Sequence, residues 1–90
     1  MLKDEIPERY SQLFRAMGHP ARLKILKGLM DKGCCVNNMA KCLKLPQSNV
    51  SQHLSVLKAA KAIKGIRKGN SISYEIADKR LRAILKEIYS

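Results

Sequence analysis

Three cysteines lie close together near the middle of this 90-residue chain, and their thiols could bind a soft metal ion or undergo oxidation. They are Cys34, Cys35 and Cys42. Their spacing does not match that of a structural zinc site, and on one helix the Cα atoms of Cys35 and Cys42 would be about 10 Å apart, too far for a disulfide. Because an odd, closely spaced set is no secreted disulfide framework, we expect a reduced, cytoplasmic protein.

A second chemically informative group is polar and lies in the segment 47–61. Its aliphatic residues Val50, Leu54 and Leu57 recur at helical spacing, so the segment is predicted to be a helix with one buried face. Amide side chains can form bidentate hydrogen bonds with adenine, and hydroxyls suit phosphates, so a major groove could accept the outer face. That face consists of Ser48, Asn49, Ser51, Gln52, Ser55 and Lys58.

The charge distribution favours a polyanionic partner. Lysine and arginine number 18 against seven aspartates and glutamates, a net charge of +11, and no acidic residue occurs between Asp31 and Glu75. Double-stranded DNA is the leading partner. A membrane surface is the weaker alternative, since the basic stretch is not one amphipathic helix. No apolar run approaches the length of a membrane span, and the N-terminus lacks the apolar stretch of a signal peptide, which agrees with the cytoplasmic expectation.

The helices and strands that position these residues are predicted from the spacing of apolar residues and from the glycines and prolines that end or begin helices. Helices are predicted over 4–17, 20–33, 35–45, 47–61 and 78–89. Between the last two, Ile72, Tyr74 and Ile76 alternate with polar residues, which predicts a β-hairpin over 63–76. We therefore expect an α+β, mainly α fold with about five helices and a two-stranded hairpin, in the arrangement of a winged helix-turn-helix.

No catalytic constellation is present in the sequence. Its two histidines, His19 and His53, fall on different predicted elements, and neither a glycine-rich phosphate loop nor a pair of central carboxylates occurs. His19 is interpreted as a helix-start residue. The protein is therefore not expected to be an enzyme.

At the level of longer motifs the chain resembles the ArsR/SmtB family of small winged-helix transcriptional repressors. The resemblance runs from about Tyr10 to Tyr89 and is most specific in HPARLKIL, LPQSNVSQHLSVLK and RKGNSISYEI. It implies a homodimer that contacts its operator through the recognition helix and the wing. It also implies release from the operator when a metal, metalloid or thiol-reactive signal binds. The implied DNA contacts are Gln47, Ser48, Asn49, Ser51, Gln52, His53, Arg67, Lys68 and Asn70.

The expected organisation is a single domain over residues 1–90. The helix-turn-helix covers about 35–60, the wing about 63–76, and dimerisation helices about 4–17 and 78–89. Apolar residues of the terminal helices support the dimer, because so small a core is often supplemented by a second subunit. These residues are Leu13, Phe14, Met17, Leu81, Ile84, Leu85 and Ile88. For His53, packing in the core and contact with a phosphate remain alternatives to contact with a base.

The sequence departs from the family pattern at two places. Lys61 and Ala62 stand where the family usually has glycine and a larger aliphatic residue, and a left-handed backbone at Lys61 would cost about 1 kcal/mol relative to glycine. Of the Cys-Val-Cys cluster in arsenic-responsive members only Cys35 remains, and the last helix has no His or Cys. Cys35 and Cys42 are thus interpreted first as packing residues and second as a redox or soft-metal switch; no cofactor is firmly expected, and a metal or metalloid effector is the alternative.

These features together predict a dimeric, sequence-specific repressor that binds a palindromic operator. Two other functions share parts of the pattern. A sequence-tolerant chromosomal DNA-binding protein would bind selected and random duplexes with a ratio of affinities near one. A winged-helix protein-interaction module would show no salt-dependent DNA binding.

Overall fold

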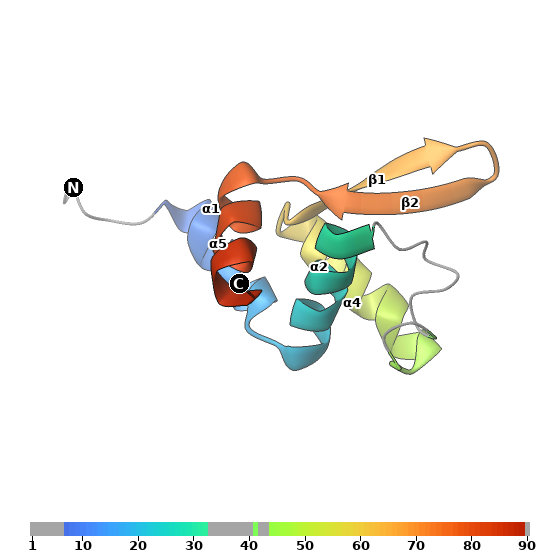
Figure 1. The fold of residues 1–90 in the computed structure, drawn as a ribbon, viewed down its shortest axis with the longest axis horizontal. Coiled ribbons are helices and arrows are strands. Elements are labelled where there is room, and N and C mark those ends of the chain that lie inside the picture. Colours follow the sequence, from blue (N-terminus) through green and yellow to red (C-terminus); the bar gives the residue numbers. More distant parts are fainter. Residues whose placement is uncertain (1–6, 33–40, 42–43, 90) are drawn as a thin grey trace.

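The computed structural model describes residues 7–32, 41 and 44–89. In chain order it contains α1 (Glu8–Met17), α2 (Pro20–Lys32), α4 (Gln47–Ala59), β1 (Ile63–Lys68), β2 (Ser71–Ile76) and α5 (Lys79–Tyr89) (Figure 1). This confirms the mainly helical α+β class, with four helices in the described part instead of about five. The helix expected over 35–45 falls largely outside the described residues. None of the described helices is long and apolar enough to cross a membrane.

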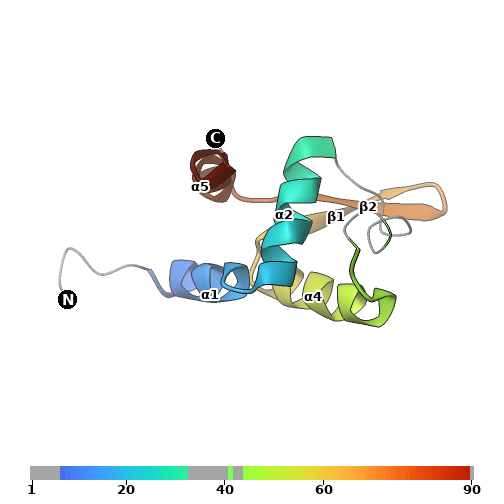
Figure 2. The same cartoon turned by 60° about the horizontal axis from the view of Figure 1, so that its bottom comes forward.

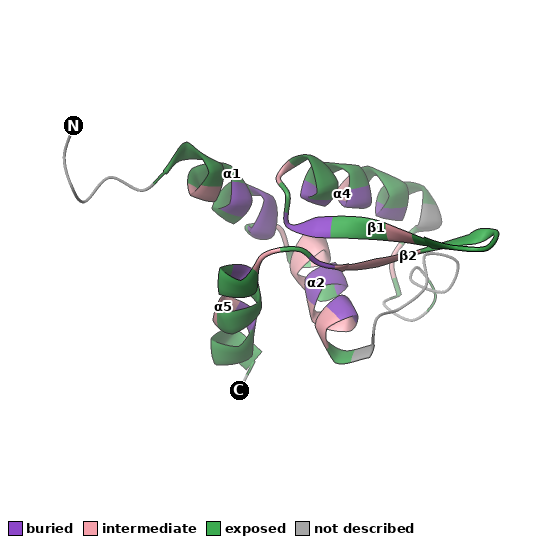
Figure 3. Cartoon of the chain, turned by 90° about the horizontal axis from the view of Figure 1, so that it is seen from above, coloured by how far each residue is buried: buried purple, intermediate pink, exposed green. Residues whose placement is uncertain are grey.

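The hairpin projects from the helical body. Figure 2 shows α1 and α4 following one another along one edge, with α2 rising from the junction between them. Helix α2 contacts α1, α4, α5 and β2, so it is the central element of the described fold. Strand β1 lies on the side of α4, and β2 lies on the side of α2 (Figure 3).

The core is formed where the apolar faces of the helices meet the base of the hairpin. The buried face predicted for α4 is confirmed, since Leu57 is 0% exposed, and it packs in one core with Ile25 and Leu26 of α2, which are also 0% exposed. Burying side chains of this size is worth about 1.5–3 kcal/mol each, which makes these faces the main source of stability.

The terminal helices differ from the expectation in how they use their apolar residues. Leu13 and Met17 of α1 are buried in the protomer's own core, as are Leu81 and Leu85 of α5. Phe14, in contrast, is 42% exposed, and Ile88 is 55% exposed. The predicted dimer face is therefore narrower than the sequence suggested, and consists of Phe14, the half-buried Ile84, and Ile88.

The hairpin has the predicted position and an antiparallel register. Ile63 pairs with Ile76 at its base, where both side chains are buried, and Lys68 pairs with Ser71 at its exposed tip. Gly69 makes the turn with φ of +61°, a conformation that costs glycine little because it has no Cβ.

The junction between α4 and β1 has the hydrogen bonds of a Schellman motif. The amide of Lys61 donates to the carbonyl of Lys58 (3.0 Å), and the amide of Ala62 donates to that of Leu57 (2.9 Å). Lys61 adopts φ of +63°, which is the left-handed backbone considered for this position in the sequence. Ala62 is fully buried, which fixes the path of the chain from the helix into the wing.

We expect Lys61→Gly to stabilise the protein by about 1 kcal/mol, because glycine adopts this left-handed conformation without the Cβ clash. The thermal midpoint should rise by about 4–8 °C in circular dichroism melts. Ala59→Gly, two residues earlier in the regular part of α4, is the control and should lower the midpoint. A Lys61→Gly protein that melts below the parent would contradict the assigned strain.

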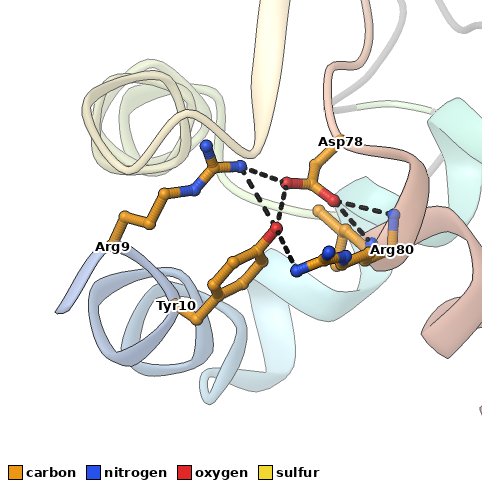
Figure 4. A network of polar contacts seen from close by, with 5 residues as sticks. Arg9, Tyr10, Asp78 and Arg80 are labelled. Carbon is orange, nitrogen blue, oxygen red and sulfur yellow. Dashed lines mark hydrogen bonds and ion pairs between the residues drawn. The ribbon is translucent and has the colours of Figure 1, made fainter. Parts of the chain in front are cut away.

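Asp78 joins the beginning of α5 to α1. Its Oδ1 accepts hydrogen bonds from the amides of Arg80 (2.7 Å) and Leu81 (3.1 Å), which caps α5. Its Oδ2 accepts from Arg9 at 2.6 Å and from the Tyr10 hydroxyl at 3.4 Å (Figure 4). Burial acts to raise the pKa of Asp78, but the two amides and Arg9 outweigh it and lower the pKa below its usual range. One carboxylate thus anchors both terminal helices next to the wing.

Candidate nucleic-acid interface

Helix α4 separates its apolar and polar residues onto opposite faces. Val50, Leu54 and Leu57 point into the core and are at most 5% exposed. The opposite face is exposed along the helix (Figure 3). Of the sequence-predicted contacts, Ser48, Asn49, Ser51 and Gln52 lie on this exposed side, and Gln47 is the first residue of the helix.

The first turn of α4 is open to an anion. Pro46 occupies the N-cap position and supplies no side-chain cap, although its carbonyl accepts the amides of Asn49 (3.0 Å) and Val50 (3.2 Å). No acidic residue lies in this turn. Amides of a first turn that no side chain caps, together with the positive end of the helix dipole, are suited to bind a phosphate group.

The hairpin tip supplies the cationic part of the candidate interface. Arg67, Lys68 and Asn70 are all exposed there, as the sequence predicted. The hydroxyl of Ser71 donates to the carbonyl of Lys68 at 3.2 Å and closes the turn. Cationic side chains on a rigid tip can contact phosphates or the minor groove next to a major groove occupied by a helix.

Several acidic residues are paired with cations away from these two surfaces. Asp31 lies 2.6 Å from Lys27 on α2, and the carboxylate of Asp78 contacts Arg9. Glu75 on the wing lies 3.2 Å from Lys64. The outer face of α4 and the hairpin tip contain no acidic residue, so both present only neutral and positive groups.

His53 lies apart from the exposed side chains of α4. It is half-buried, and its ring lies against that of His19, with centroids 4.7 Å apart. Its Nδ1 is 3.4 Å from Nη1 of Arg22, whose Nε donates to the carbonyl of Ala16. The ring of His19 is held in turn by the Ala21 amide, which donates to its Nδ1 at 3.1 Å. These contacts connect α4 to the link between α1 and α2.

The surroundings of His53 disfavour its protonated form. Burial lowers the pKa of His53, and the neighbouring His19 and Arg22 lower it further. The imidazole is therefore neutral at pH 7, and its Nδ1 accepts a hydrogen bond from Arg22 if the proton is on Nε2.

A fall in pH below about 6.5 is expected to destabilise the protein through this residue. The depressed pKa means that the unfolded chain binds a proton more readily than the folded one, so stability is lost as the pH falls toward the folded-state pKa. Urea unfolding at pH 7.5 and 5.5 would measure this loss. In His53→Gln the loss should be smaller, and an unchanged loss would show that His53 is not responsible.

Cys35 and Cys42, predicted as packing residues or a switch, lie outside the described residues. Within the described ranges, no group of three or more His, Cys, Asp or Glu side chains could hold a metal ion.

One surface feature was not predicted from the sequence. Between α4 and the wing there is a hollow of about 220 Å³, lined by Ser51, Leu54, Ser55, Lys58 and Tyr74. Ser55 and Lys58 were placed on the outer face of α4, but Tyr74 was treated only as part of an alternating strand. The role of Tyr74 could have been inferred from Gly65, the only residue of the expected first strand without a side chain.

An amphipathic helix with an exposed polar face, followed by a basic hairpin, is the arrangement of recognition helix and wing in winged helix-turn-helix proteins. A profile of the family described as bacterial regulatory protein, arsR family, matches residues 19–61. The transcriptional repressor SmtB of Mycobacterium tuberculosis is 38% identical over 81 residues, which are 90% of this chain and 60% of that protein. The chain therefore spans less than two thirds of the length of that relative.

Two solved structures extend the comparison. The transcriptional repressor PagR of Bacillus anthracis has a TM-score of 0.84 at 38% identity, over 90% of this chain and 93% of that one. The cadmium metal-sensor CmtR of M. tuberculosis has a TM-score of 0.75 at 36% identity, over 87% and 81% of the two chains. The protein belongs to the ArsR family of transcriptional regulators. Its relatives are named as regulators and not as enzymes.

Proposed function

We propose that the protein is a sequence-specific repressor that binds a palindromic operator as a homodimer. The observation that carries the proposal is the exposed, acid-free face of α4, which contacts β1 of a hairpin with a basic tip. In this proposal Gln47, Ser48, Asn49, Ser51 and Gln52 contact the major groove, and Arg67, Lys68 and Asn70 contact the adjacent backbone or minor groove. His53 positions α4 through His19 and Arg22.

The dimer is supported by the apolar surface that the protomer leaves uncovered on its terminal helices. Phe14, Ile84 and Ile88 are exposed or half-buried, and a hollow of about 260 Å³ lies among Pro7, Tyr10, Phe14, Arg80 and Ile84. A second copy would cover this surface. Its recognition helix would then enter a major groove about one helical turn away, roughly 34 Å along the duplex.

The release signal is proposed to be a small inorganic or thiol-reactive compound. Support comes from CmtR, which is named as a cadmium metal-sensor, and from Cys35, which matches the cysteine position of arsenic-responsive members. A soft metal, arsenite or an oxidant could each react with a thiolate. The parent and Cys35→Ser proteins should therefore differ in how their DNA affinity responds to these compounds, and an identical response would remove Cys35 from the switch.

The experiment that tests the proposed function is a titration of a labelled duplex with the protein at several salt concentrations. Affinity should fall steeply as salt rises, because each phosphate contact releases counterions. Sedimentation equilibrium should give a dimer at micromolar concentration. A monomer would contradict the dimer, and an absence of salt-dependent binding would favour a protein-interaction module.

A further inference from the structure

The hollow between α4 and the wing has the composition of an anion site. Ser51, Ser55 and Lys58 line it from successive turns of α4, and Tyr74 lines it from β2. Only Leu54 is apolar among its lining residues, and none is acidic. The wing and the recognition helix therefore share a small polar surface that neither presents alone.

Tyr74 reaches this hollow because of the residue opposite it. Strand β1 lies between α4 and β2, and Tyr74 pairs across the hairpin with Gly65 (Figure 3). A Cβ on Gly65 would lie 3.4 Å from Cε1 and 3.8 Å from Cδ1 of the tyrosine ring. The ring thus lies over the position that a side chain on β1 would occupy, and extends from the far strand toward α4.

The polar groups around the hollow are available to a ligand. Among the described residues, Lys58 forms no ion pair and the Tyr74 hydroxyl has no hydrogen-bond partner. The hydroxyl of Ser55 donates to the Ser51 carbonyl at 3.1 Å. Glu75, the acid next to Tyr74 in sequence, points to the other face of the hairpin, where it pairs with Lys64 at 3.2 Å.

We propose that this hollow binds one phosphate of the DNA backbone where the duplex passes from α4 to the wing. The ammonium group of Lys58 neutralises the phosphate, and the hydroxyl of Tyr74 donates a hydrogen bond to one of its oxygens. The proposal rests on the proposed DNA-binding function. A backbone phosphate is favoured over a free anion because one exposed lysine holds an isolated ion weakly, whereas a duplex is held at the same time by α4 and the hairpin tip.

The contact would also fix the angle between the two DNA-binding elements. A phosphate bound between α4 and β2 connects the helix to the hairpin through the nucleic acid. Since phosphate contacts position a protein without reading sequence, the loss of this contact should weaken binding to every duplex by a similar factor.

The test compares Lys58→Gln, Tyr74→Phe and the double variant in binding to a short duplex of arbitrary sequence over a range of salt concentrations. Lys58→Gln should reduce the slope of log affinity against log salt by about one. Tyr74→Phe keeps the ring and should weaken binding about tenfold without changing the slope. Because both groups contact one phosphate, the binding free energy lost in the double variant should be smaller than the sum of the losses in the two single variants.

Lys64→Gln is the matched control, since it removes the same charge from the opposite face of the hairpin, where Lys64 already pairs with Glu75. The proposal would be overturned if Lys64→Gln reduced the salt slope as much as Lys58→Gln does. It would also be overturned if Lys58→Gln and Tyr74→Phe bound the duplex like the parent. If the parent itself binds no duplex, the proposed function fails. Binding of inorganic phosphate alone, at an affinity that Lys58→Gln abolishes, would assign the hollow to a free anion instead. Thermal melts confirm that each variant folds.

Discussion

Gln52→Ala is expected to weaken binding to a selected operator duplex by about 1–3 kcal/mol, which is roughly five- to 150-fold, and to leave binding to random duplex almost unchanged. Gln52 is exposed on the outer face of α4, where its amide can form two hydrogen bonds with the edge of an adenine. Such a contact discriminates between bases, so removing it weakens binding to the cognate sequence. Anisotropy titrations with both duplexes at one salt concentration measure the effect.

Lys68→Ala is the control for this result, because Lys68 lies at the hairpin tip and carries charge without a base-specific pattern of donors and acceptors. It should weaken binding to both duplexes alike and reduce the salt slope by about one. If Gln52→Ala instead causes equal losses on operator and random duplex, α4 does not read bases through this residue.

Leu57→Ala is expected to destabilise the protein by about 2–5 kcal/mol, the range for deletion of a buried leucine side chain. Leu57 is 0% exposed and lies where α4 packs on the core, and its carbonyl also accepts the amide of Ala62 at the start of the wing. The thermal midpoint should fall by about 8–40 °C. DNA affinity measured well below the new midpoint should change much less.

The matched control is Val56→Ala, one residue earlier on the same helix, because the side chain of Val56 is 41% exposed. Removing this side chain leaves no enclosed cavity, so the loss of unfolding free energy should be well under that of Leu57→Ala. Similar losses for the two variants would mean that α4 does not pack on the core through its Leu57 face.

The elements with strong periodicity could be predicted from the sequence. The buried faces of α2 and α4 follow from aliphatic residues at helical spacing, and the hairpin follows from the alternation that ends at Ile76. In each of these cases the local pattern and the tertiary contacts agree. The strain at Lys61 was also predictable, because glycine is the usual residue at the left-handed position that ends a helix.

What could not be predicted depends on contacts between distant residues. Periodicity places Leu13 and Phe14 on one apolar face. The packing of α1 separates them, because Leu13 is buried in the core and Phe14 is exposed. Asp78 was given no role from the sequence, because its bond to Arg9 joins residues 69 positions apart. The contacts of His53 with His19 and Arg22 connect α4 to the start of α2, and no local pattern in the sequence predicts them.

The most direct test of sequence-specific repression is the ratio of two dissociation constants at physiological salt. A duplex is first selected by the protein from a random pool, and its affinity is compared with that of a scrambled duplex of equal length and composition. We predict that the selected duplex binds at least about a thousandfold more tightly than the scrambled one. A ratio near one would contradict this prediction, and would identify a DNA-binding protein that recognises the backbone and not the sequence.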